Sequence, residues 1–273
     1  MSRFRAACVQ LRSSDDVAEN IQATCALIGD AKALGAQFVA TPENTTLMAP
    51  DGGAKLERCF EEEADPALPT FQSLAERLDL WLLIGSLAIK TSPDKTANRS
   101  FLIDPRGRIV ARYSKIHLFD VDLPSGEKYR ESNTVAGGDG AVIADTPWAK
   151  FGLTICYDLR FPQLYRVLAK AGATVLTVPS AFTETTGKAH WHTLLRARAI
   201  ENGAFVIAPA QGGLHANGRR TYGHSLIVAP WGEILAEGGT EPGVIVADID
   251  IALALDARTR VPSLKHDRPF KGP

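Results

Sequence analysis

The sequence predicts an α/β fold with a mixed sheet, and two observations carry this prediction. Short apolar segments of strand length alternate with amphipathic segments of helix length along the chain. A hairpin interrupts the alternation where two apolar segments flank Pro105-Arg106-Gly107, and it places antiparallel strands beside parallel ones. No repeat or composition break is visible, so we expect a single domain over residues 1–273, with residues 258–273 as a C-terminal arm.

The first half of the chain predicts two helices between strands. Ser13, Ser14 and Asp15 offer N-caps for the first helix, which Gly35 ends. Pro69 stands near the start of the second helix, whose residues 71, 74 and 78 form one apolar face. The expected strands of this half are residues 4–11, 37–41, 81–89, 100–104 and 108–113.

The second half returns to the same alternation after a long polar segment. Residues 115–140 are rich in Asp, Pro, Gly and Ser without a clear period, and a loop of this length inside a compact domain is usually functional. The expected helices are residues 162–171 and 189–202, the latter stopped by Gly203. The expected strands are residues 151–156, 174–178, 204–210, 222–229 and 244–249.

Charge and cysteine content exclude several classes of function. The chain carries 30 Lys and Arg against 31 Asp and Glu, so it lacks the basic field of a nucleic-acid or polybasic membrane binder. No apolar segment is long enough to span a bilayer, and the first residues do not resemble a secretory signal. The four scattered cysteines form no CxxC pair. We therefore expect a cytoplasmic protein with reduced thiols.

Three predicted strands end in chemically useful side chains. Glu43 follows the strand over residues 37–41, Lys115 follows the hairpin, and Cys156 ends a later strand. Sites in open α/β sheets gather beyond the carboxyl ends of strands, so these three groups can meet. A thiol near a helix N-terminus or a lysine is expected to rest as the reactive thiolate. A carboxylate, an ammonium and a thiol together are sufficient for covalent hydrolysis.

Each of these residues also has an ordinary structural interpretation. Free cysteines are most often buried and inert, so Cys156 by position alone fits a structural thiol. Glu43 can be a solvated loop carboxylate and Lys115 a surface lysine. Only the occurrence of all three residues at strand ends favours a catalytic role over these structural ones. A Cys–His dyad also remains open, with residue 117, 190 or 224 as the base.

Other catalytic and cofactor motifs are absent from the sequence. There is no GxSxG, no phosphate-binding GxxxxGK[ST] and no GxGxxG. His190 and His192 are two residues apart on a predicted helix and point to different sides, and HExxH is missing, so we expect no metal site. We expect no organic cofactor either. Arg219 and Arg220 lie in a Gly-rich segment before a strand, where an arginine can bind a carboxylate.

Three sequence motifs resemble those of the nitrilase superfamily of carbon–nitrogen hydrolases. They are GLTICYDLRFPQL around Cys156, ATPENT around Glu43 and YSKIHLFDVDLPSG around Lys115, in the family's order. The resemblance runs from Phe4 to about Pro262. It implies a four-layer α-β-β-α sandwich in a single carbon–nitrogen hydrolase domain. It also implies a homodimer or larger homo-oligomer, paired through the face of the helix after the Cys156 strand.

The resemblance also implies roles for the site residues. Glu43 would be the general base, Lys115 the oxyanion-stabilising cation and Cys156 the nucleophile that forms a thioester. Glu131 would be the supporting second glutamate, with Glu127 as a rival that fits less well. The backbone N–H of Tyr157 would be the second oxyanion donor.

Within the superfamily, the segments HLFDVDLPSG, AFTETTGKAHWHTLLRARAIE and AQGGLHANGRRTYGHSLIV with PWG resemble the Nit branch. The segment from Gln211 to Ser225 resembles deaminated glutathione amidases more than ω-amidases. This implies hydrolysis of a small 2-oxo-acid amide, giving 2-oxoglutarate and cysteinylglycine from deaminated glutathione. The alternative is ω-amidase activity on 2-oxoglutaramate, and Arg160, Arg219 or Arg220 would anchor the carboxylate of either substrate. A true nitrilase and a catalytically silent binding protein are further alternatives. The chain departs from the branch pattern at Gln163, His192, Gly203 and Ala229, which weakens transfer of the substrate.

Overall fold

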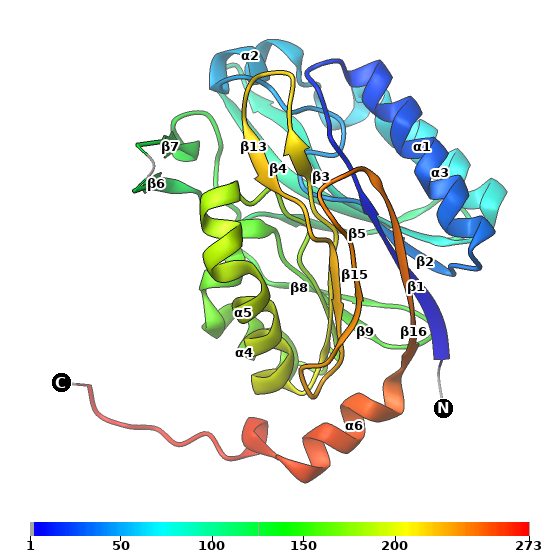
Figure 1. The fold of residues 1–273 in the computed structure, drawn as a ribbon, viewed down its shortest axis with the longest axis vertical. Helices are drawn as coiled ribbons and strands as arrows, with labels where there is room; N and C mark the ends of the chain where they lie inside the picture. The colour runs from blue at the N-terminus through cyan, green and yellow to red at the C-terminus, as the bar shows by residue number, and fades with distance from the viewer. Residues whose placement is uncertain (1–2, 125, 273) are drawn as a thin grey trace.

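The computed structural model describes residues 3–124 and 126–272, and this part of the chain forms two six-stranded mixed sheets (Figure 1). The first sheet has the order β16 (Gly243–Asp250), β1 (Arg3–Gln10), β2 (Phe38–Ala40), β3 (Trp81–Ser92), β4 (Lys95–Ile103) and β5 (Ile109–Ser114). The second has the order β15 (Ile234–Glu237), β14 (Leu226–Val228), β11 (Phe205–Ala208), β10 (Val175–Thr177), β9 (Lys150–Leu153) and β8 (Val142–Asp145). Two small hairpins pair β6 (Asp120–Asp122) with β7 (Lys128–Arg130) and β12 (Gly212–Leu214) with β13 (Arg220–Tyr222).

The two sheets pack face to face through apolar side chains. Side chains alternate along a strand, and β1 is apolar on both faces: Ala6 and Cys8 point into the core between the sheets, while Ala7 and Val9 point to the opposite side. A direct contact across the core is that of Phe38 with Phe151, from β2 and β9, whose ring centroids are 4.8 Å apart. The sheets therefore share one hydrophobic core.

Helices cover the outer face of each sheet. The helices α1 (Val17–Ala33) and α3 (Ala67–Leu78) pack on the first sheet, and α4 (Pro162–Lys170) and α5 (Glu184–Asn202) pack on the second (Figure 1). This arrangement confirms the four-layer α-β-β-α sandwich. The remaining helices are α2 (Gly52–Arg58), which the sequence did not predict, and α6 (Ile251–Arg260).

Helix and strand ends differ from the predictions where side chains or glycines redirect the backbone. Asp16, not one of the three preceding residues, caps α1 by accepting the Glu19 N–H at 2.9 Å, because Ser13 is hydrogen-bonded to the Thr45 carbonyl. The strand expected over residues 222–229 is broken, since Gly223 and His224 have positive φ values of 69° and 54°. The break separates β13 from β14.

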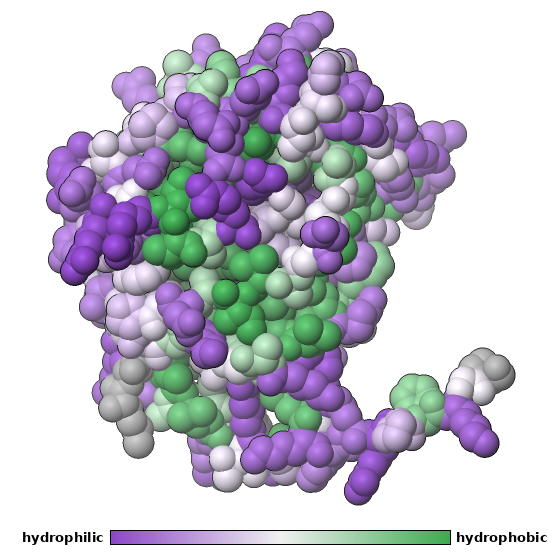
Figure 2. Space-filling model, turned by 180° about the vertical axis from the view of Figure 1, so that it is seen from behind, coloured by the Kyte–Doolittle hydropathy of each residue, from purple (hydrophilic) through white to green (hydrophobic). Residues whose placement is uncertain are grey.

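The long polar segment after β5 is partly ordered into regular structure. It contains the β6–β7 hairpin and a 3₁₀ turn over Glu131–Asn133, so it is a folded loop at the edge of the sandwich. At the other end of the chain, α6 extends to Arg260, into the segment expected to be an arm, and a 3₁₀ turn follows at Ser263–Lys265. Figure 2 shows the final segment standing clear of the body, and an apolar area in the middle of the same face. No described helix is both long and apolar enough to cross a membrane.

Candidate active site

The three predicted strand ends open into one pocket at the end of the sandwich. Glu43 lies just beyond β2, Lys115 directly follows β5, and Cys156 lies just beyond β9. All three line a pocket of about 660 Å³, a size suited to a small-molecule substrate. Since β2 and β5 belong to the first sheet and β9 to the second, the pocket depends on the face-to-face packing of the two sheets.

A glycine allows the Glu43 segment to approach the sheet. A Cβ atom on Gly85, in β3, would lie 2.0 Å from the Thr41 carbonyl oxygen, which is a severe clash. The Gly85 N–H instead donates to the Thr41 hydroxyl at 3.0 Å. Asn44, the residue after Glu43, has φ of 57°, a left-handed conformation that asparagine tolerates well. Its N–H is held by the Ser86 hydroxyl at 2.9 Å.

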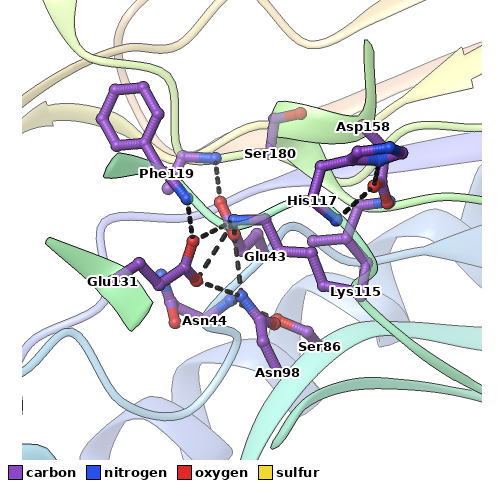
Figure 3. A network of polar contacts seen from close by, with 12 residues as sticks. Glu43, Asn44, Ser86, Asn98, Lys115, His117, Phe119, Glu131, Asp158 and Ser180 are labelled. Carbon is purple, nitrogen blue, oxygen red and sulfur yellow. Dashed lines mark hydrogen bonds and ion pairs between the residues drawn. The ribbon is translucent and has the colours of Figure 1, made fainter. Parts of the chain in front are cut away.

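The centre of the site is the buried ammonium of Lys115 between two carboxylates (Figure 3). Its Nζ lies 2.9 Å from Glu43 Oε1 and 2.8 Å from Glu131 Oε2. The Lys115 side chain is only 2% exposed, so these ion pairs are shielded from solvent.

Neutral donors hold the two carboxylates in place. The Asn98 amide, from β4, donates to Glu43 Oε1 at 2.9 Å and to Glu131 Oε1 at 3.2 Å. The second oxygen of Glu43 accepts the Ala181 N–H at 2.9 Å, and that of Glu131 accepts the Phe119 N–H at 2.7 Å. Glu43 is thus bonded to β4 of the first sheet and to the segment that follows β10 of the second.

Burial and charge act in opposite directions on the pKa values of this cluster. Burial lowers the pKa of Lys115, but the charges of Glu131 and Glu43 outweigh it and place that pKa well above its ordinary value. Burial likewise raises the pKa of Glu131, but the charges of Lys115 and Lys55 and the hydrogen bonds it accepts lower it to about 2. Lys115 and Glu131 are therefore both ionised at neutral pH.

Cys156 stands on a strained turn that presents its side chain to the pocket. It opens a 3₁₀ turn over Cys156–Arg160 and has φ of 48°, a conformation rare for residues other than glycine. Its own N–H donates to the Pro179 carbonyl at 3.0 Å, so this N–H is already engaged.

The surroundings of Cys156 oppose its ionisation, which argues against the expected resting thiolate. Burial and then the charge of Glu43 raise its pKa far above the ordinary value, and the opposing charge of Lys115 is too small to reverse the shift. The lysine does not stabilise a thiolate here because Glu43 and Glu131 already neutralise it. The sulfur consequently needs a base when it attacks.

Asp158 ties the Cys156 turn to the Lys115 strand. This fully buried carboxylate accepts the Ile155 N–H at 2.9 Å, the Tyr113 hydroxyl at 2.6 Å and the His117 N–H at 3.1 Å. Tyr113 and His117 flank Lys115, so one side chain fixes the spacing between the two segments.

The structure separates the candidate arginines. Arg160 and Arg219 line the pocket: the Arg160 guanidinium lies over the Tyr157 ring, and Arg219 lies over the Tyr129 ring and donates to the Ala181 carbonyl at 2.8 Å. Arg220 was wrongly placed by the sequence interpretation, because it lines a second, smaller cavity instead. Adjacent residues at the start of a strand point to opposite sides, which sends Arg219 and Arg220 apart.

The alternative bases and the rival glutamate lie elsewhere. No described histidine lines the pocket: His117 bonds Asp158, His190 contacts Arg160, and His224 bonds Glu237. A Cys–His dyad is therefore excluded for the described chain. Glu131, not Glu127, contacts Lys115, while Glu127 accepts the Tyr129 hydroxyl at 2.9 Å.

Among the polar residues at the site that sequence reasoning missed are Asn98, which holds the two carboxylates, and Lys55, which lines the pocket. Asn98 lies in β4, a few residues before the strand predicted at residue 100, and an asparagine inside a strand is itself an unusual signal. Lys55 lies in the unpredicted helix α2, lines the pocket, and has its pKa lowered by burial despite the charges of Glu131 and Glu43.

Comparisons with known proteins agree on one family. Residues 5–259 match the family model described as carbon-nitrogen hydrolase. The chain is 42% identical over 273 residues to a Synechocystis protein named deaminated glutathione amidase, covering 97% of this chain and 98% of the relative. It is 34% identical over 268 residues to the human omega-amidase NIT2, covering 98% and 96%. The crystal structure of the C. elegans NitFhit protein superimposes with a TM-score of 0.91 at 35% identity, covering 98% of this chain and 66% of that one.

The low pKa of Glu131 predicts a pH-dependent contribution to stability. A carboxyl whose folded pKa lies near 2 instead of 4.5 stabilises the fold above the higher value and loses this contribution as the pH falls through the lower one. The free energy of unfolding should therefore differ between the native chain and Glu131→Gln at about pH 6, and the difference should shrink toward about pH 3. Urea unfolding at both pH values measures it. A difference that stays constant with pH would contradict the ion-pair assignment.

Proposed function

Because this chain belongs to the carbon–nitrogen hydrolase family, we propose that it hydrolyses the amide bond of a small 2-oxo-acid amide through a thioester on Cys156. The observation that carries the proposal is the convergence of Glu43, Lys115 and Cys156 on one pocket. The deaminated glutathione and ω-amidase activities named for its relatives differ in the amine that leaves, while both substrates carry a 2-oxo acid.

The proposed reaction begins with a neutral thiol. Glu43 takes the Cys156 proton as the sulfur attacks the amide carbon, and the carbonyl electron pair moves onto oxygen. When the C–N bond breaks, Glu43 passes the proton to the leaving nitrogen and a thioester remains. Water then gives a proton to Glu43 and attacks the thioester; the C–S bond breaks, the acid leaves and Cys156 regains its proton.

The proposed oxyanion donors are Lys115 and the N–H of Tyr157. Lys115 carries a charge held by burial between two carboxylates, and preorganised charge in a shielded site stabilises a developing oxyanion strongly. The Cys156 N–H is engaged by Pro179, which favours the following N–H of Tyr157 as the second donor. Glu131 and Asn98 act through Lys115 and Glu43, and we assign both as positioning residues.

The proposed anchor for the substrate carboxylate is the basic side of the pocket. Arg160, Arg219 and Lys55 line it, and among the described residues none of the three forms a salt bridge with a carboxylate. Unneutralised cations at a pocket wall favour an anionic ligand. The pocket of about 660 Å³ is large enough for either substrate. The higher identity to a protein named deaminated glutathione amidase, 42% against 34% to an omega-amidase, favours deaminated glutathione.

A catalytically silent binding protein on the same fold is less well supported. Glu43, Lys115 and Cys156 all line one pocket, and hydrogen bonds hold Glu43 and Lys115 in a fixed mutual position. A regulatory relative without catalysis would not need to keep a lysine buried between two carboxylates.

We also propose that the protein is cytoplasmic and forms a homodimer or larger homo-oligomer. Four free thiols support the location. Exposed apolar side chains on the helix face after the Cys156 strand support the assembly, namely Val167 in α4 and Ile200 in α5. Sedimentation as a monomer at micromolar concentration would exclude the assembly.

Turnover on two substrates tests the proposed activity. The chain should release 2-oxoglutarate from deaminated glutathione faster than from 2-oxoglutaramate, and no nitrile should be a comparable substrate. Cys156→Ala removes only the sulfur and should leave trace activity, with the melting temperature kept as the control for folding. Undiminished turnover by Cys156→Ala would rule out the thioester route.

A matched pair of variants tests the carboxylate anchor. Arg219→Met should raise the KM for both substrates about tenfold or more, since a hydrogen bond to a charged group contributes roughly 1.5–3 kcal/mol. Arg220→Met, its neighbour outside the pocket, should leave KM unchanged. Equal effects of the two substitutions would show that Arg219 does not bind the substrate, and so would a lower kcat at unchanged KM.

A further inference from the structure

A second cluster of reactive side chains lies outside the pocket. His192 Nε2 is 2.9 Å from Glu237 Oε1, and His224 Nδ1 is 3.0 Å from the same oxygen. The three potential ligand atoms all lie within 4.8 Å of one another. Two imidazoles and a carboxylate at this spacing form the kind of donor set that binds borderline divalent metals.

The three residues come from three separate elements of the second sheet and the helix that covers it. His192 is on α5, Glu237 ends β15, and His224 lies in the break between β13 and β14. His224 adopts a φ of 54°, in the left-handed region that is uncommon for residues other than glycine, although histidine enters it more often than most. Residues held in such conformations often serve a function, because the surrounding structure must stabilise them.

An aromatic ring orients both imidazoles. Tyr222 stacks on His224 with centroids 4.3 Å apart and 26° between the planes, and it meets His192 edge-on at 6.0 Å. The imidazoles are thereby turned toward Glu237 before any ligand arrives. Such orientation by neighbouring groups is what a metal site needs from its surroundings.

The cluster is accessible without being fully solvated. The side chains of His192, His224 and Glu237 are 30%, 27% and 37% exposed. These exposed fractions give an ion access from solvent. His224 and Tyr222 also line the smaller cavity, of about 330 Å³. Cys156 does not line this cavity, so the cluster is separate from the thiol chemistry.

We propose that His192, His224 and Glu237 form a binding site for a divalent transition metal, Zn²⁺ being the best match to two imidazoles and one carboxylate. On binding, each imidazole offers the lone pair of its facing nitrogen to the metal: a neutral ring carries its proton on the other nitrogen, and a protonated ring first releases one proton to solvent. Water completes the coordination. The metal links α5 to the β14–β15 hairpin and stabilises the fold. It takes no part in amide hydrolysis. This departs from the sequence-based expectation of no metal, which rested on the spacing of His190 and His192 on one helix and on the missing HExxH motif.

Zn²⁺ titration tests the site when the active-site thiol is removed. In a Cys156→Ala background, calorimetry should show one Zn²⁺ bound per chain, and Zn²⁺ should raise the melting temperature. His192→Ala and Glu237→Gln should each weaken binding about tenfold or more. His190→Ala, on the same helix but outside the cluster, should bind Zn²⁺ like its parent. Co²⁺ bound at the site should lack the intense near-ultraviolet band of thiolate ligation.

Several results would overturn the proposal. They are no Zn²⁺ binding by the Cys156→Ala parent, unchanged affinity in both His192→Ala and Glu237→Gln, or an equal loss in His190→Ala. The melting temperatures of the metal-free variants report folding. Glu237→Gln, a conservative change of a partly exposed side chain, keeps the test decisive if the histidine variant is unstable.

Discussion

A buried ammonium between two carboxylates is the constraint on which the rest of this site depends. Lys115 is almost without solvent contact, and burying such a charge without partners would be strongly unfavourable. Removing one partner of a buried ion pair typically costs about 3–5 kcal/mol, so Glu43 and Glu131 must both be in place. The need for Glu131 beside Lys115 explains why the polar segment after β5 is ordered. Glu131 lies on the 3₁₀ turn of this segment and accepts the Phe119 N–H from the same segment.

The same cluster determines the resting state of the nucleophile. With its charge already balanced by two carboxylates, Lys115 does not hold a thiolate, and the charge of Glu43 opposes ionisation of Cys156. A neutral thiol beside a carboxylate is suited to attack with simultaneous proton transfer. It also avoids a permanent thiolate, the form of cysteine that oxidises most readily. The position of the Cys156 side chain is set instead by the strained φ of Cys156 and by the Asp158 carboxylate, which accepts the neighbouring Ile155 N–H.

The sequence predicted the site residues that stand directly after an apolar strand. Glu43, Lys115 and Cys156 each follow an apolar segment, and the carboxyl ends of strands meet at one edge. Glu131 lies in a segment without periodicity, so it came from family resemblance alone. Asn98 and Lys55 were missed because β4 begins earlier than its apolar residues suggest and α2 is short. Arg220 was misplaced because the start of β13, which sets its direction, lies in the middle of a polar Gly-rich segment. The His192 cluster needs contacts between segments distant in the chain, which no local pattern reports.

Mass spectrometry of the acid-quenched enzyme tests the central claim most directly. When the protein turns over deaminated glutathione, the account predicts a peptide containing Cys156 that carries a thioester-linked 2-oxoglutaryl group, and its loss when Glu43 is replaced by glutamine, because the thiol then lacks its base. An acyl group found on another residue, or turnover by the native enzyme with no covalent species, would contradict a site in which Glu43, Lys115 and Cys156 act together.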